Sequence, residues 1–191
     1  ITGVFTVAST GESWALSVEE KTRLFQLTMA IVQKRVPVIA GVGAPSTRES
    51  IQLAEAAQKA GVDYLCAAPP SFVRPNQDEM IAHFGAIARA TNTPLILYNI
   101  PMLAGNILGT PAVKTLTERF AQIIGIKDSG GDLTVLNDLV IGHRSDFSVV
   151  TGIDTLVLPG LLAGSQGAIL GSANVCPDLS LQVLRLFDEG R

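Results

Sequence analysis

Short apolar segments and longer amphipathic segments alternate along nearly the whole chain, and this alternation restricts the possible folds most. Runs rich in β-branched or small apolar residues predict strands at residues 3–8, 36–42, 62–67, 94–98, 121–127, 147–151 and 167–170. Helical periodicity predicts helices at residues 17–33, 46–60, 77–91, from 110 onward, 132–141, 156–162 and 179–187. Such alternation predicts a parallel sheet covered by helices.

Two architectures fit this pattern, a (β/α)8 TIM barrel and an open, doubly wound sheet. A barrel needs eight strands and typically about 250 residues, whereas this chain has 191 residues and seven strand-like segments. The chain begins close to a strand-like segment and ends with a helix-like one. We therefore expect a TIM barrel that lacks its first βα unit and its C-terminal helices. Because no linker or change in composition divides the chain, we expect residues 1–191 to form a single domain, truncated at both ends.

Composition and spacing exclude several classes of function. The net charge of −3 and the pI near 5.3 give no basic surface for nucleic acid, and no apolar run approaches the roughly 18 residues of a membrane helix. The two histidines, His83 and His143, are far apart and do not form a metal-binding motif, so no metal is expected. With only Cys66 and Cys176 present, we expect buried free thiols and a cytoplasmic protein.

The position of Lys127 in the sequence indicates a possible catalytic role. It follows the apolar run Ile123-Ile124-Gly125-Ile126 and precedes the turn Asp128-Ser129-Gly130-Gly131. A lysine at the mouth of a buried strand is a candidate amine nucleophile that forms a Schiff base with a carbonyl substrate. The alternative is a lysine that extends into solvent or pairs with Asp128. Tyr98 ends the preceding strand at the same level, where its phenol can exchange a proton with the amine.

Three motifs in this order resemble the family of dihydrodipicolinate synthase and N-acetylneuraminate lyase, the class I pyruvate-type aldolases. They are Ser9-Thr10-Gly11-Glu12, then Tyr98-Asn99-Ile100-Pro101, then the segment from Gly125 to Asp132. The resemblance extends over essentially the whole chain and implies the TIM barrel fold.

The resemblance also implies roles for individual residues. Lys127 forms the imine with C2 of a 2-oxo acid, and Tyr98 relays protons while the imine forms and breaks down. Ser9 and Thr10 hold the substrate carboxylate; the alternative is that their hydroxyls only cap a turn. Further substrate-binding positions are Ser129, Gly152, Asp154, Leu103 and Phe72. No cofactor is expected, because the protonated imine is itself the electron sink.

Two positions depart from the synthase pattern. The synthases carry an arginine for a second carboxylate where this chain has Met102-Leu103-Ala104, and a second tyrosine, donated by a neighbouring subunit, where Phe72 stands. The Leu103 and Asp154 motifs look closer to the sialic acid lyase branch, although Thr155 and Gly171 differ from it. Gly125 to Asp132 also looks like the 4-hydroxy-2-oxoglutarate aldolase branch.

We therefore expect a lysine-imine lyase or aldolase that cleaves or forms a carbon–carbon bond, with pyruvate as one partner. Its substrate would be a keto-deoxy sugar acid, or resemble N-acetylneuraminate or 4-hydroxy-2-oxoglutarate. The alternatives are 4-hydroxy-tetrahydrodipicolinate synthase, a keto-deoxy sugar acid dehydratase, and a non-catalytic homologue that binds 2-oxo acids. The resemblance further implies a homotetramer built from two dimers.

Overall fold

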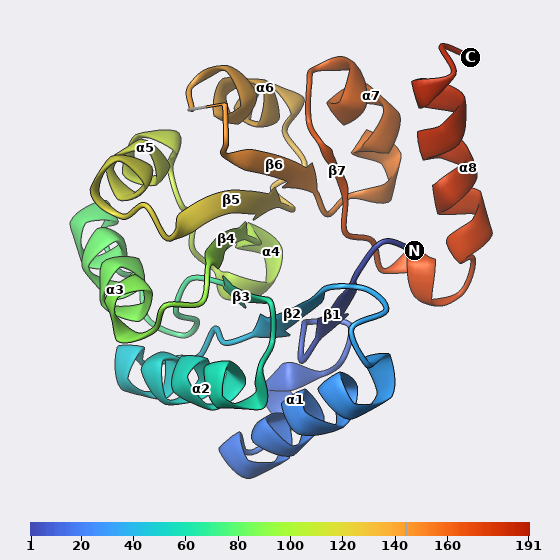
Figure 1. Cartoon of the computed structure of the whole chain (residues 1–191). Coiled ribbons are helices and arrows are strands. Elements are labelled where there is room, and N and C mark those ends of the chain that lie inside the picture. The colour runs from blue at the N-terminus through green and yellow to red at the C-terminus, as the bar shows by residue number, and fades with distance from the viewer. Residues whose placement is uncertain (144) are drawn as a thin grey trace.

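A parallel sheet of seven strands, hydrogen-bonded in chain order, forms the centre of the molecule (Figure 1). The computed structural model describes residues 1–143 and 145–191. The strands are β1 (Val4–Thr6), β2 (Val38–Gly41), β3 (Tyr64–Ala67), β4 (Leu95–Asn99), β5 (Ile123–Asp128), β6 (Ser148–Thr151) and β7 (Gly167–Ala168). The sheet curls so that the helices lie on its outside, as in a barrel wall. A doubly wound sheet reverses its strand order and carries helices on both faces, so that alternative is excluded.

The helices follow the strands in alternation. They are α1 (Val18–Val32), α2 (Thr47–Ala60), α3 (Gln77–Ala90), α4 (Pro101–Ala104), α5 (Thr110–Arg119), α6 (Leu133–Ile141), α7 (Val157–Leu162) and α8 (Pro177–Asp188). Ser17 and Glu20 form a reciprocal capping box that begins α1. Ser46 caps α2 by accepting from the backbone N–H of Glu49, while the Glu49 carboxylate turns toward Lys21.

Side chains from the helices and the outer face of the sheet form one hydrophobic cluster. Its fully buried members include Phe25, Leu53, Phe84, Leu116, Leu65, Leu95 and Ile123. Each large side chain removed from water contributes roughly 1.5–3 kcal/mol to folding. This outer core fixes the strands, so that their carboxyl ends, where a barrel carries its active site, lie at one end of the sheet.

The seven predicted strands and their parallel arrangement are confirmed, with ends shifted by a few residues. The short helix α4 and the 3-10 turns Ser13–Ala15, Asp154–Leu156 and Ser172–Asn174 were not predicted. The prediction of two buried thiols was half wrong: Cys66 is buried, but Cys176 is exposed at the start of α8. Of the helices in the described part of the chain, none combines the length and the apolar character needed to cross a membrane.

Candidate active site

Lys127 and Tyr98 lie directly opposite each other on neighbouring strands. The register of β4 and β5 pairs Tyr98 with Lys127 and Asn99 with Asp128, which confirms that the two residues end adjacent strands at the same level. The Lys127 Nζ donates a hydrogen bond of 3.1 Å to the Tyr98 Oη and lies 4.2 Å from the centroid of the tyrosine ring. Both side chains are only 6% exposed. The amine is therefore buried beside a phenol and is not an ordinary strand-end lysine extended into solvent.

A glycine on the next strand makes room for the lysine. A Cβ atom at Gly152, which follows β6, would lie 2.8 Å from Cε of Lys127 and 2.0 Å from Oγ of Ser129. Real Cβ atoms do not approach other atoms so closely, so a side chain at position 152 would displace Lys127. The structure thus places Gly152 against Lys127 and Ser129, two other predicted site residues, and gives Gly152 a steric role.

Ser9, in the segment that follows β1, approaches the same phenol. Its Oγ lies 3.5 Å from the Tyr98 Oη, so Tyr98 stands between Lys127 and Ser9. The chain reaches this position through a strained turn, because Val7, a β-branched residue, has a φ of 56°. Gly41 permits this turn, since a Cβ there would meet the carbonyl oxygen of Val7 at 1.9 Å. Thr10 is exposed and does not line the cleft described next.

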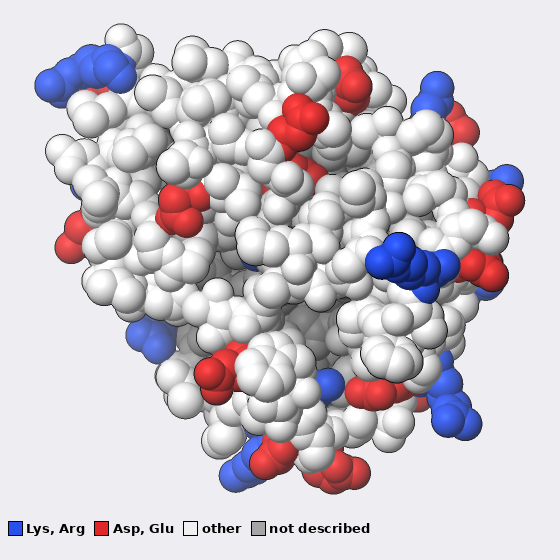
Figure 2. All heavy atoms as spheres, turned by 180° about the vertical axis from the view of Figure 1, so that it is seen from behind, with Lys and Arg blue, Asp and Glu red and all other residues white. Residues whose placement is uncertain are grey.

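A cleft with a volume of about 500 Å³ opens beside this group, a size within the range of roughly 300–1,000 Å³ for small-molecule sites. Ser9 and Tyr98 line its inner part, and Leu103 of α4 lines it near the rim. The face of the molecule turned away from the viewer in Figure 1 is hollowed between mostly uncharged side chains (Figure 2). A small carbonyl compound in the cleft would have the Tyr98 phenol, and behind it the Lys127 amine, at its inner end.

A buried amide–carboxylate pair connects the ends of β4 and β5. The Asn99 Nδ2 donates to the Asp128 carboxylate at 2.7 Å, and the Asn99 Oδ1 accepts from the backbone N–H of Leu108. Burial raises the pKa of the Asp128 carboxyl above its usual value, while hydrogen bonds from Asn99 and from the Gly130 N–H oppose that rise. This network holds the two loops that follow Tyr98 and Lys127.

Two further titratable groups are buried without a direct part in this arrangement. Burial raises the pKa of the Cys66 thiol to about 12, although the charge of nearby Lys127 lowers it in part; the thiol therefore stays protonated and is a poor nucleophile. Burial also lowers the pKa of His83 to about 4, so its ring is neutral near pH 7. His83 accepts from or donates to the Thr47 hydroxyl at 2.8 Å, between α2 and α3.

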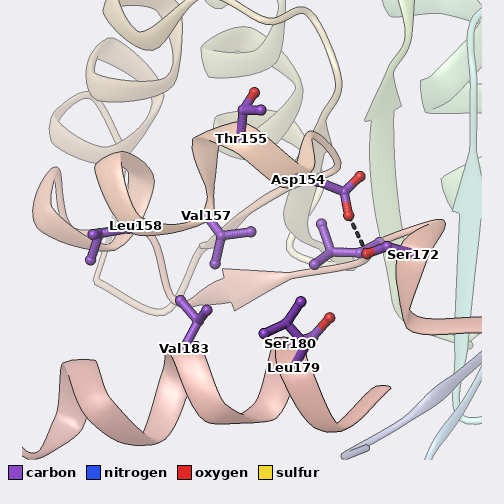
Figure 3. A pocket seen from close by; sticks show the side chains of 9 residues that line it. Asp154, Thr155, Val157, Leu158, Ser172, Leu179, Ser180 and Val183 are labelled. Carbon is purple, nitrogen blue, oxygen red and sulfur yellow. Dashed lines mark hydrogen bonds between the residues drawn. The ribbon is translucent and has the colours of Figure 1, made fainter. Parts of the chain in front are cut away.

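Asp154 lines a cavity that does not include Lys127. That cavity, of about 210 Å³, is formed by the segment around α7 together with α8 and Ser172 (Figure 3). The Asp154 carboxylate is exposed and accepts a hydrogen bond from the Ser172 hydroxyl, as Figure 3 shows. The predicted substrate contact through Asp154 is thus separated from the cleft that contains Ser9 and Tyr98.

Phe72 also lies outside the cleft. Its side chain is fully exposed, and its φ of 72° shows a strained backbone. Within the single chain, Phe72 therefore forms no part of the cleft. In contrast, Leu103 lines the cleft, with 62% of its surface still exposed.

Sequence reasoning missed an ion pair in the wall of the cleft. The Lys21 Nζ lies 3.5 Å from the Glu49 carboxylate, and the Lys21 side chain is 7% exposed. The two residues come from α1 and α2, 28 positions apart, so no local pattern connects them. Glu49 drew attention only as a possible capping residue. Across the described residues, no cluster of three or more metal-ligating side chains is present.

Comparison with known proteins places this geometry in a family. Among curated proteins, 4-hydroxy-tetrahydrodipicolinate synthase of Methanopyrus kandleri is 36% identical over 188 residues, which is 98% of this chain and 63% of that protein. The synthase of Bacillus subtilis is 36% identical over 183 residues, 96% of this chain and 63% of that protein. The chain thus spans less than two thirds of the length of these relatives.

Solved structures agree with the curated relatives. The 4-hydroxy-tetrahydrodipicolinate synthase of Methylacidiphilum fumariolicum superposes with a TM-score of 0.96 at 41% identity, covering 100% of this chain and 63% of that one. YagE, an E. coli prophage protein solved in complex with pyruvate, also gives 0.96, at 34% identity, covering 100% of this chain and 65% of that one. A family model described as the dihydrodipicolinate synthetase family matches residues 1–191, and the chain therefore belongs to the dihydrodipicolinate synthetase family.

Proposed function

We propose that the protein is a class I lyase that forms an imine between Lys127 and the keto carbon of pyruvate or of a longer 2-oxo acid. The observation that carries this proposal is the hydrogen bond of 3.1 Å between the buried Lys127 amine and the Tyr98 phenol. An imine-forming lysine needs a partner that takes up and returns protons. The YagE structure, which was solved with pyruvate, supports a 2-oxo acid as the ligand.

In the proposed reaction, the Lys127 Nζ attacks C2 of the 2-oxo acid, and the resulting carbinolamine loses water to give the imine. When C4 of the substrate carries a hydroxyl, this hydroxyl loses its proton to a base and becomes the aldehyde carbonyl. The bond between C3 and C4 breaks, and its electron pair moves into the protonated imine to form an enamine as the aldehyde leaves. Protonation of the enamine at C3 and hydrolysis of the imine release pyruvate and restore the amine. Tyr98 relays the protons of imine formation and cleavage, because its hydroxyl is the group hydrogen-bonded to the amine.

The predicted substrate-binding residues have distinct places in this proposal. Ser9, which lies beside Tyr98, and Thr10 would hold the substrate carboxylate through their hydroxyls and the backbone N–H groups of their loop. Ser129 and Gly152 border Lys127 and would leave space for the carbonyl carbon. Leu103 would contact the aldehyde half of the substrate, since it lines the cleft near its rim. A contact from Asp154 would require a substrate that extends beyond the cleft.

A second candidate is 4-hydroxy-tetrahydrodipicolinate synthase itself. It is favoured by the names of relatives that are 36–41% identical to this chain. The same imine would then react with an aldehyde that carries a second charged group, for which Met102-Leu103-Ala104 supplies no cation.

We also propose that the protein is a cytoplasmic homotetramer made of two dimers. Free thiols fit a reducing compartment. Exposed apolar side chains near the cleft, at Trp14, Phe72, Met102 and Leu103, form a surface that a second copy could cover, with Phe72 reaching the neighbouring site. Sedimentation velocity of the full-length protein tests this: Phe72→Asp should lower the mass of the assembly, and a wild-type monomer would refute the proposal.

A further proposal is that the complete barrel contains an eighth strand. Within the described residues, β1 is hydrogen-bonded only to β2, and β7 only to β6. Unpaired strand edges are aggregation sites that proteins cover or close. We infer that in the functional protein a further strand joins β7 to β1 and completes the (β/α)8 barrel. The greater length of the relatives supports this inference.

Exchange of the pyruvate methyl protons with solvent tests the imine proposal without knowledge of the aldehyde. An enamine formed on Lys127 takes up deuterium at C3 when it is protonated in D2O. We expect the methyl signal of pyruvate to decrease in a proton NMR time course with full-length wild type. With Lys127→Ala, the signal should decrease only as fast as it does in buffer without protein. A wild type that exchanges no faster than Lys127→Ala would rule out the proposed chemistry.

A further inference from the structure

The charges in the wall of the cleft point to the chemical class of the aldehyde half. Among the described residues that line it, the charged side chains are Lys21 and Glu49, and these two pair with each other at 3.5 Å. Recruiting Lys21 to bind a substrate anion would take the buried amine away from the Glu49 carboxylate, its partner, which is itself 33% exposed. Lys127, the other nearby cation, is consumed by the imine in the proposed reaction. A carboxylate on the aldehyde half would therefore find no free cation.

Many of the side chains that line the cleft are apolar. Ile100, Leu103 and Ala104 line it on the side of α4, and Ala68 and Pro69 line it on the side of the loop after β3. Burying an unpaired carboxylate against such a surface is unfavourable. Burying an alkyl or aromatic chain there is favourable, because it removes apolar area of both partners from water.

The wall also provides little for a polyol. Recognition of several hydroxyls requires placed polar groups. The carboxylate that could serve a sugar chain, Asp154, lies in the separate cavity beside α8 and is bonded to Ser172. Ser13 and Ser71 contribute hydroxyls to the lining of the cleft, both in half-buried positions, and neither is charged.

We propose that the aldehyde partner of this protein is uncharged and carries an apolar chain, aliphatic or aromatic. This inference rests on the imine chemistry proposed above and adds the substrate class for the second half of the site. It separates this chain from its relatives named as 4-hydroxy-tetrahydrodipicolinate synthases, because a synthase of that kind needs a cation where Leu103 stands.

Two pairs of aldehydes matched in length test the proposal with the full-length protein. Butyraldehyde and succinic semialdehyde differ only in a methyl group against a carboxylate, and propionaldehyde and glyceraldehyde differ only in hydroxyls. Consumption of pyruvate with each aldehyde gives kcat/KM. We expect butyraldehyde to exceed succinic semialdehyde, and propionaldehyde to exceed glyceraldehyde, by about tenfold or more, since a site rejects a group that it would have to bury unpaired.

Two arginine variants test whether the side chain at position 103 determines the preference between charged and uncharged aldehydes. Leu103→Arg places a cation in the cleft and should raise kcat/KM for succinic semialdehyde relative to butyraldehyde about tenfold. Met102→Arg is the matched control: Met102 is adjacent and 83% exposed, and it does not line the cleft, so the ratio should stay unchanged.

The remaining outcomes distinguish a failure of the apolar-aldehyde inference from a failure of the imine proposal. Wild-type preference for succinic semialdehyde or for glyceraldehyde would overturn the apolar-aldehyde inference while leaving the imine chemistry intact. Exchange of pyruvate protons without condensation with any of the four aldehydes would overturn it as well. Absence of proton exchange would instead remove the imine proposal on which the inference rests.

Discussion

Gly152→Ala is expected to lower imine formation with pyruvate by about 100-fold or more, although the changed residue carries no functional group. The added Cβ would lie 2.8 Å from Cε of Lys127 and 2.0 Å from Oγ of Ser129, so the lysine must leave its place beside Tyr98. Displacing a reacting group by about 1 Å can cost on the order of 10² in rate. The measurement is the rate of pyruvate proton exchange, with thermal unfolding followed in parallel.

The matched control for this prediction is Gly171→Ala. Gly171 has a φ of −66°, and a Cβ there would meet Thr10 Oγ1 at 3.6 Å, an ordinary contact, so this variant should exchange like wild type. The double variant Gly152→Ala, Ser129→Ala removes the shorter clash but keeps the one with Lys127. It should regain thermal stability and stay inactive. Recovery of exchange in the double variant would show that the lysine does not need the space at position 152.

Tyr98→Phe is expected to slow imine formation by about 10²- to 10⁴-fold, the usual contribution of a positioned acid–base group. The phenylalanine ring keeps the edge-on packing against Phe5, where the ring centroids are 6.3 Å apart, so folding should be preserved. Only the hydroxyl that joins Lys127 to Ser9 is lost. The measurement is the rate of pyruvate proton exchange as a function of pH.

Tyr64→Phe serves as the control, because it removes the phenol of the other tyrosine, which lies half-buried on β3. It should exchange at the wild-type rate. If Tyr98→Phe matched Tyr64→Phe across the whole pH range, the phenol would have a packing role, and a water molecule or another group would have to move the proton.

The sequence was sufficient to predict the pairing of Tyr98 with Lys127. Alternating elements imply a parallel sheet, and consecutive strands in such a sheet are usually neighbours, so two residues at the ends of consecutive strands fall at the same level. The observed register of β4 and β5 follows this rule. The same reasoning placed Ser9 near this end of the sheet.

Other parts of the site depend on distances that no local pattern encodes. The steric role of Gly152 requires the coordinates of Lys127 and Ser129, and the strain at Val7 requires its backbone angles. The Lys21–Glu49 pair joins two helices through packing. Asp154 follows β6 and turns toward Ser172 and a different cavity, because the chain enters a 3-10 turn at that point. Phe72 remains a prediction that involves a second copy of the chain.

The central claim is that Lys127 forms a covalent imine, and reductive trapping tests it most directly. Full-length protein is incubated with pyruvate and borohydride, measured as an intact mass, and digested to locate the adduct. We expect the mass of the wild type to increase by one pyruvate, less one water and plus two hydrogens, with the adduct on Lys127 and no adduct in Lys127→Ala. An unmodified wild type, or an adduct of equal yield in Lys127→Ala, would contradict it.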